Sequence, residues 1–226
     1  PTCSDVSVAG WRIGGFASGA SGGIALPGGA KIPGHGYYLI TITNGLNTIN
    51  GVSVDYNAGI DPGCCPAGNY IPDANGSARL TNGGLEVDRV GWGSGVGEGT
   101  SIANPNANTF LERKAGYYST MASNGVGGNH ADRGNGQDSD NNLVDWVKMT
   151  NSVDTPPKNS YNGFNDPGNW RENPVGYASC PATNTIPSHV VISRVDARAT
   201  LREHIELYNP TCSDVSVAGW RIGGFA

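Results

Sequence analysis

The sequence predicts an all-β fold. Glycine and proline account for 35 and 14 of its 226 residues, and no long segment repeats its apolar residues at the helical period. Seven Asn-Gly pairs mark turns, because asparagine and glycine adopt positive φ at little cost. These pairs begin at Asn44, Asn50, Asn75, Asn82, Asn124, Asn135 and Asn162. Such a composition is typical of short strands joined by many turns.

The expected strands follow one another along the chain, with long Gly- and Asn-rich loops between them. In residues 37–43 neighbouring side chains point to opposite sides, which predicts a strand with one buried face. Two strands are expected in residues 77–92, around an Asn-Gly-Gly turn. The other expected strands are residues 6–13, 110–114, 143–149, 190–195 and 204–208, and the loops include residues 44–79, 93–108 and 115–142.

The chain ends on a copy of its own beginning. Residues 210–226 are identical to residues 1–17, and an identity of this length does not plausibly arise by chance. The sequence therefore predicts slightly more than one period of a tandem array, with a period of 210 − 1 = 209 residues. The alternative is an artificial overlap of the two ends.

Five segments carry motifs in a characteristic order. HIELYNP and VSVAGWRI lie in residues 204–222 and are followed, across the period, by IALPGGAKIPGHGYYLI (24–40), LTNGGLEVDRVGWG (80–93), LERK (111–114) and GQDSDNNLVDWV (136–147). In this order they resemble the lamin tail domain family in its bacterial, extracellular form. The resemblance implies an immunoglobulin-like β-sandwich with long Gly- and Asn-rich loops.

The resemblance also implies that the period is cut in mid-domain. Residues 1–155 are then a lamin-tail-like β-sandwich without its first strands, residues 156–189 an inter-repeat linker, and residues 190–226 the first strands of the next repeat. The linker is more aromatic than a free linker, so its rings are expected to dock on a neighbouring repeat, together with part of the 204–208 strand. The expected docking residues are Tyr161, Phe164, Trp170, Tyr177, Ile205 and Leu207.

The charge and hydropathy of the chain exclude two classes of partner. A formal net charge of −5 with only 14 lysines and arginines provides no basic stripe for a nucleic acid. No apolar run approaches the roughly 20 residues of a membrane-spanning helix. The expected partners are identical repeats of the same or of neighbouring chains.

The cysteines predict an oxidised, extracellular framework. Because Cys212 repeats Cys3, each period holds four thiols, an even number that fits two disulfides with three possible pairings. Adjacent cysteines rarely bridge each other, so Cys64 and Cys65 are expected to have different partners. Cys3 and Cys180 are the candidates for these partners. A zinc site is the alternative, but no C-x-x-C pair or histidine at ligand spacing accompanies the cysteines.

An acidic stretch and a sequon are the candidate binding and modification sites. Carboxylate and amide oxygens in residues 132–142 are suitable ligands for Ca²⁺, although the spacing is not that of an EF-hand. The candidate ligands are Asp132, Asp138, Asp140 and Asn142. The alternative is that Asp138 and Asp140 accept hydrogen bonds from loop amides in Asx-turns. Asn75 begins an Asn-Gly-Ser sequon and is a candidate for glycosylation, and no other cofactor is expected.

No catalytic site is expected, because the four histidines are scattered and none accompanies a convincing nucleophile. These features predict a structural repeat unit of a secreted or cell-surface filament, whose units join by docking or by strand completion. The alternative is a non-catalytic accessory domain of a secreted enzyme, used for adhesion or glycan binding. Trp92, Trp170 and Tyr117 are then the candidate stacking platforms for a sugar.

Overall fold

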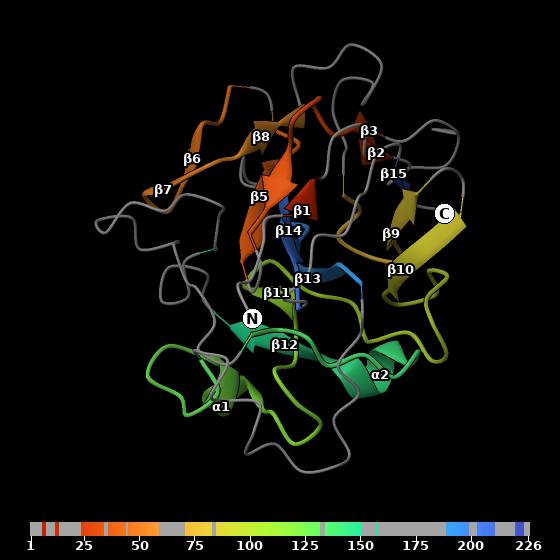
Figure 1. Ribbon diagram of the computed structural model, residues 1–226. Helices are drawn as coiled ribbons and strands as arrows, with labels where there is room; N and C mark the ends of the chain where they lie inside the picture. Colours follow the sequence, from red (N-terminus) through yellow and green to blue (C-terminus); the bar gives the residue numbers. More distant parts are fainter. Residues whose placement is uncertain are drawn as a thin grey trace, which may run out of the picture.

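Strands dominate the part of the chain that the computed structural model describes (Figure 1). This part comprises residues 24–33, 36–43, 45–58, 71–82, 85–131, 134–150, 189–198 and 203–210, together with Pro157 and the backbone of residues 6–7, 12–13 and 220–223. The predicted all-β fold is confirmed. Among the described residues, no helix has the length and apolar character needed to cross a membrane.

Six strands form the larger sheet. Their order is β12 (Trp146–Thr150), β11 (Thr109–Arg113), β13 (Val191–Asp196), β14 (His204–Tyr208), β5 (Tyr37–Thr41) and β8 (Tyr56–Asn57). All neighbours are antiparallel except β5 and β8, which are parallel. Figure 1 shows β13 and β14, in blue, at the centre of the molecule.

Five strands form the second sheet. Their order is β10 (Leu85–Gly91), β9 (Ser77–Asn82), β15 (Trp220–Gly223), β2 (Arg12–Ile13) and β3 (Ile24–Ala25), and β15 also pairs with β3. Two small sheets pair β1 (Val6–Ser7) with β4 (Lys31–Ile32) and β6 (Thr48–Ile49) with β7 (Val52–Ser53). Asn50 and Gly51 join β6 to β7 with φ of 52° and 82°, as the Asn-Gly pair predicts for a two-residue hairpin.

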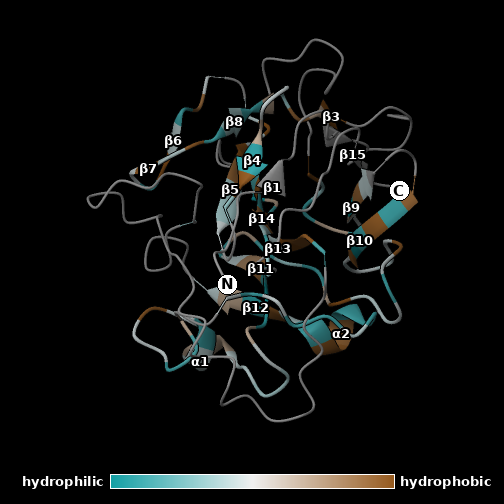
Figure 2. Ribbon diagram, viewed as in Figure 1, coloured by the Kyte–Doolittle hydropathy of each residue, from teal (hydrophilic) through white to brown (hydrophobic). Residues whose placement is uncertain are grey.

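The two larger sheets share one hydrophobic core. Leu80 and Val90 of the five-stranded sheet belong to the same buried cluster as Leu111, Val195 and Ile205 of the six-stranded sheet. The hydropathy colours of Figure 2 follow this arrangement, with brown residues along β13 in the middle of the molecule. Burial of this apolar surface is the main favourable contribution to folding.

Strand β5 is buried on both of its faces, whereas its alternation predicted burial on one. Tyr38 and Ile40 point into the shared core. On the other side, Leu39 packs against the β6–β7 hairpin. Tyr37 stacks on Tyr208 with ring centroids 4.8 Å apart. The second face is covered by the β6–β7 hairpin and by Tyr208. The alternation of residues within β5 does not predict these contacts.

Two short helices replace expected loop and strand. The strand expected at 143–149 begins only at Trp146, because residues Asn142–Asp145 form helix α2. The Asn141 side chain caps this helix by accepting a hydrogen bond from the Leu143 N–H. Helix α1 (Met121–Asn124) lies in the expected 115–142 loop and has a Thr120 capping box.

The strands of the 190–226 segment lie in the same two sheets as residues 24–150. Strand β14 pairs with β5 over five residues, from His204 opposite Thr41 to Tyr208 opposite Tyr37. On its other side lies β13, which pairs in turn with β11. Strands β13 and β14 therefore occupy the centre of this chain's own six-stranded sheet. Of the expected 156–189 linker, only Pro157 and His189 lie within the described residues.

Candidate functional site

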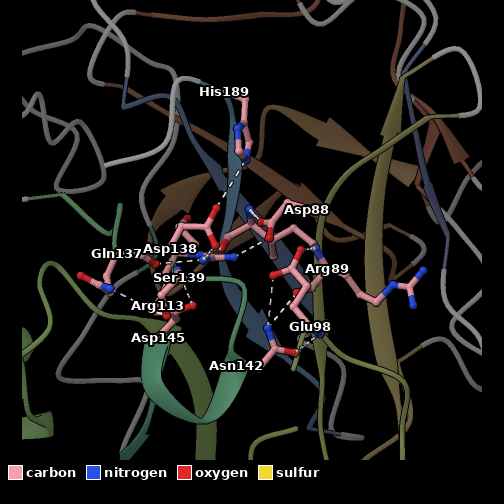
Figure 3. A network of polar contacts seen from close by, with 12 residues as sticks. Asp88, Arg89, Glu98, Arg113, Gln137, Asp138, Ser139, Asn142, Asp145 and His189 are labelled. Carbon is pink, nitrogen blue, oxygen red and sulfur yellow. Dashed lines mark hydrogen bonds and ion pairs between the residues drawn. The ribbon is translucent and has the colours of Figure 1, made fainter. Parts of the chain in front are cut away.

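Arg113 is the centre of a buried polar network between the two sheets (Figure 3). Its side chain is fully buried and uses all three guanidinium nitrogens. Nη2 donates to Asp88 Oδ1 at 2.6 Å, Nη1 to Asp138 Oδ1 at 3.2 Å and to the Gln137 carbonyl at 2.9 Å, and Nε to the Ile192 carbonyl at 2.8 Å. The network thus connects β10, β11, β13 and the loop before α2.

Asp88 completes the link between the two sheets. Its side chain is buried on β10. One carboxylate oxygen binds Arg113, and the other accepts a hydrogen bond from the Ile192 N–H at 2.5 Å. Ile192 lies where the pairing of β13 with β14 is irregular, so a side chain rather than a strand satisfies its N–H. Charge-assisted hydrogen bonds of this kind are stronger than neutral ones.

Asn142 fixes the backbone beside the network. Its Oδ1 accepts hydrogen bonds from the N–H groups of Gly91 at 2.8 Å and Glu98 at 3.0 Å, and its Nδ2 donates to the Arg89 carbonyl at 2.9 Å. A Cβ on Gly91 would lie 2.5 Å from the Gly97 nitrogen, so glycine is required for this close approach. Asn142 therefore attaches α2 to the end of β10.

Asp145 organises the loop that precedes it. It accepts hydrogen bonds from Ser139 Oγ at 2.7 Å, the Ser139 N–H at 2.8 Å, the Asn141 N–H at 3.2 Å and Gln137 Nε2 at 3.2 Å. Asp138 accepts from the Asp140 N–H, as expected for an Asx-turn. The loop is thus held by hydrogen bonds within the protein.

Electrostatic interactions divide the carboxylates of the network into two kinds. Burial opposes ionisation of Asp138, but its hydrogen bond to His189 and the charge of Arg113 hold its pKa at about 2. Burial raises the pKa of Asp88 in spite of Arg113. Burial, together with the nearby Asp88, raises the pKa of Glu98 to about 9. Glu98 is therefore protonated at neutral pH, and Arg113 stabilises the ionised form of Asp138.

Three carboxylates of this network lie close enough together to be considered as a cation site. Ligand atoms of Asp88, Glu98 and Asp138 lie within 4.8 Å of one another. However, the Arg113 guanidinium already binds two of the carboxylates, Asp88 and Asp138. The positive charge at these two carboxylates therefore comes from Arg113, which does not favour Ca²⁺ among them.

The three expected calcium ligands that the structure describes lie in different environments. Asp138 belongs to the Arg113 network, and the Asn142 oxygen accepts from two backbone N–H groups. Asp140 is exposed and has a positive φ of 55°. Asp132 lies outside the described residues. The group that the structure brings together contains Asp88 and Glu98, which the sequence did not single out because they are distant from the acidic stretch.

A second buried network crosses the six-stranded sheet. Arg194 on β13 donates to Glu112 on β11 at 2.9 Å and stacks over the Phe110 ring, with 4.1 Å between its Cζ and the ring centroid. Asn135 donates to Glu112 at 3.0 Å and accepts from the Tyr37 hydroxyl at 3.0 Å. Strand β13 is therefore attached to residues 37–150 by two networks as well as by its strand pairing.

The remaining predicted site residues have varied surroundings. All five cysteines (Cys3, Cys64, Cys65, Cys180 and Cys212) and the four linker rings (Tyr161, Phe164, Trp170 and Tyr177) lie outside the described residues. Ile205 and Leu207, expected at an inter-repeat contact, are fully buried in the core of this chain. Asn75 is exposed at a positive φ of 58°, and its glycosylation stays a prediction.

The structure brings together one serine–histidine pair that the sequence did not predict. Ser119 Oγ lies 2.8 Å from His130 Nδ1 and accepts a hydrogen bond from the Gly116 N–H at 3.0 Å. The two residues are 11 positions apart, without a recognisable motif. Ser119 is buried, so this contact fits the closing of the 116–130 loop rather than attack on a substrate.

Comparison with protein-family models, with curated proteins and with solved structures gave no match. The motifs quoted above therefore carry the lamin-tail resemblance by themselves. Three of these motif segments meet in the Arg113 network: residues 80–93 contribute Asp88, residues 111–114 contribute Arg113, and residues 136–147 contribute Asp138. The fold thus brings into contact side chains from three segments that are separate in the sequence.

Replacement of Glu98 by glutamine is expected to stabilise the protein on the order of 2 kcal/mol at pH 8 and to change little at pH 4. The folded-state pKa of Glu98 is raised from 4.5 to about 9. The unfolded state therefore releases a proton that the folded state keeps, and stability falls as the pH rises through this window. Glutamine removes this dependence and keeps an oxygen for the Arg89 N–H.

The test is the urea midpoint of the wild type and Glu98→Gln at pH 4, 6 and 8. Glu86→Gln is the control, because the Glu86 side chain is 36% exposed and the same chemical change there removes no buried carboxyl. A difference between Glu98→Gln and wild type that stays constant over the three pH values would contradict the predicted proton linkage.

Proposed function

We infer that this chain is one period of a structural repeat in an extracellular or cell-surface filament. The repeating unit is a lamin-tail-like β-sandwich of the immunoglobulin type. The observation that carries this proposal is the identity of residues 1–17 and 210–226, combined with the position of β13 and β14. These strands directly precede the second copy and fill the centre of the six-stranded sheet.

The 209-residue period then defines the order of the segments within one repeat unit. A unit that starts near Val190 passes through β13, β14 and the repeated 17 residues, and continues at residue 18 of the following period. In this order β13 and β14 would pair with β11 and β5 of the following period, the equivalents of the strands with which they pair in this chain. Residues 156–189 connect consecutive units.

The internal contacts suit a mechanical role. Repeat arrays transmit load through every unit, so the first strand of a unit must be held firmly by the rest. Strand β13 is held by its pairing with β11 and β14, by Arg113 at the Ile192 carbonyl and by Asp88 at the Ile192 N–H. Disulfides among the four cysteines of each period would add covalent links, as expected in extracellular proteins.

The test is electron microscopy of the purified native material. The proposal expects fibres with a regular axial spacing, and expects the 17-residue sequence to occur more than once in the parent polypeptide. Isolated particles together with a single occurrence of this sequence would contradict it. These two measurements also separate a true array from an artificial overlap.

The alternative is an accessory domain of a secreted enzyme that binds glycans. One observation favours it: Tyr117 and Tyr118 are 44% and 65% exposed, and their rings meet edge to face at 5.0 Å. Trp92, an expected stacking platform, is fully buried and donates to the Pro72 carbonyl, so this role for Trp92 is wrong. Glycan-array binding that is lost in Tyr118→Ala would favour the alternative over the filament.

A further inference from the structure

The two identical 17-residue copies pair with the same residue of the five-stranded sheet. Ile13 of the first copy lies opposite Ile24 in an antiparallel pair. Ile222 of the second copy also lies opposite Ile24 in an antiparallel pair. Ile13 and Ile222 are equivalent positions, because 222 − 13 equals the period of 209 residues. Both copies therefore use the same partner, in the same orientation, through the same residue.

The two copies differ in how completely they are paired. Strand β15 of the second copy also pairs with β9 over four residues, from Trp220 opposite Asn82 to Gly223 opposite Arg79. Strand β2 of the first copy lies beside β15 in a parallel pair, with Arg12 opposite its own equivalent, Arg221. Strand β15 thus occupies the position next to β9, and β2 lies between β15 and β3 in the strand order of the sheet.

We propose that the position next to β9 and opposite Ile24, which β15 occupies, is an acceptor site for one strand, and that its ligand is the repeated 17-residue sequence supplied by another copy of this chain. This inference rests on the proposed repeat function and specifies how neighbours join. Main-chain hydrogen bonds supply the affinity in such strand addition. Because the two copies are identical, a strand from a neighbour makes the same backbone pairing as the chain's own strand, as in domain swapping.

The register defines what a strand has to match at this site. Four consecutive residues of β15 face four consecutive residues of β9 while one of them faces Ile24. An unrelated strand would have to satisfy both neighbours in the same short register. The tandem period guarantees that every copy of the chain carries a sequence already matched to this site.

The test measures uptake of a fluorescent peptide with the sequence of residues 210–226, with serine in place of Cys212 to prevent thiol exchange. The full chain is compared with Ile13→Pro, Ile222→Pro and the double variant, because proline removes the N–H and cannot continue the strand pairing. The double variant is expected to bind the peptide at least tenfold more tightly than the wild type, whose own copy competes. A peptide with proline at the Ile222 position should bind at least tenfold more weakly.

A second measurement does not depend on the fold of the variants. The same peptide, with a photoactivatable leucine at the Ile222 position, is irradiated with the wild-type full chain. Cross-links are expected at residues 24–25 and 79–82, and mass spectrometry locates them. Cross-links elsewhere, or none, would overturn the proposal. Equal binding of the two peptides to a folded double variant would also overturn it.

The outcomes separate strand donation from the filament itself. Regular fibres with no peptide uptake would leave the filament in place and reject the acceptor site. Peptide uptake at the expected residues without fibres in the native material would support the acceptor site and reject the filament. A double variant that is unfolded alone but gains β-structure with the peptide, and not with the proline peptide, would support the acceptor site.

Discussion

Replacement of Arg113 by methionine is expected to lower the free energy of unfolding by about 3–5 kcal/mol. Methionine fills part of the volume but leaves the Asp88 and Asp138 carboxylates buried without their cation. It also leaves the carbonyls of Gln137 and Ile192 without a donor. For a chain of this size the loss corresponds to a decrease of about 6–20 °C in Tm. Thermal and urea unfolding measure it.

A matched substitution tests whether the large loss expected for Arg113→Met arises from the burial of its ion pairs. Arg79 also pairs with a carboxylate, Glu86 at 3.7 Å, but the two side chains are 29% and 36% exposed. Arg79→Met is therefore expected to cost less than about 1 kcal/mol. Equal losses in the free energy of unfolding for Arg79→Met and Arg113→Met would show that the buried network stabilises the protein no more than an exposed ion pair does.

A double substitution tests the pairing itself. If the cost of Arg113→Met comes from an uncompensated charge on Asp88, then Asp88→Asn in the same chain should recover part of the loss. The coupling between the two sites is expected to be about 0.5–3 kcal/mol. Additive effects would instead mean that Arg113 acts through its other contacts, which are Asp138, two backbone carbonyls and the Trp146 ring, 4.9 Å from Cζ to the ring centroid.

The local sequence predicted the longer strands but placed β6, β7 and β8 in an expected loop, and beyond one hairpin it did not show which strands lie side by side. The Asn-Gly-Gly turn correctly placed β9 and β10 together, and the apolar runs correctly placed β13 and β14. Residue Leu143 belongs to a run that alternates like a strand, yet the Asn141 cap and the hydrogen bonds to Asp145 favour a helical turn first. Such competition is decided by side-chain hydrogen bonds, which hydrophobic periodicity does not record.

The sequence predicted only part of the candidate site, because it does not show which distant residues lie together. The density of carboxylates near Asp138 is visible in the sequence, and it predicted a calcium site. The positive charge at Asp138 comes instead from Arg113, 25 residues earlier, and the hydrogen bond that Arg113 donates to the Ile192 carbonyl spans 79 residues. Contacts over such separations depend on sheet order, and this order became known only from the fold.

The position of Ile205 leads to the second large effect. Ile205 was expected to contact a neighbouring repeat, but it is fully buried between Val195 and Ile40 in the six-stranded sheet. Ile205→Ala is therefore expected to lower the free energy of unfolding of a single chain by about 2–5 kcal/mol, through lost burial and the cavity left behind. Urea unfolding of the variant and the wild type measures this loss.

The dependence of this stability loss on protein concentration shows whether Ile205 stabilises the chain's own core or contacts a neighbouring repeat. If the residue stabilises the chain's own core, the loss for Ile205→Ala is the same at low and high protein concentration, since folding is then unimolecular. If it mainly contacts a neighbour, dilute wild type and dilute variant would unfold at the same urea concentration, and the difference would grow as the chains associate. Leu143→Ala is the control, because Leu143 is 55% exposed and its truncation should change stability by no more than about 0.5 kcal/mol.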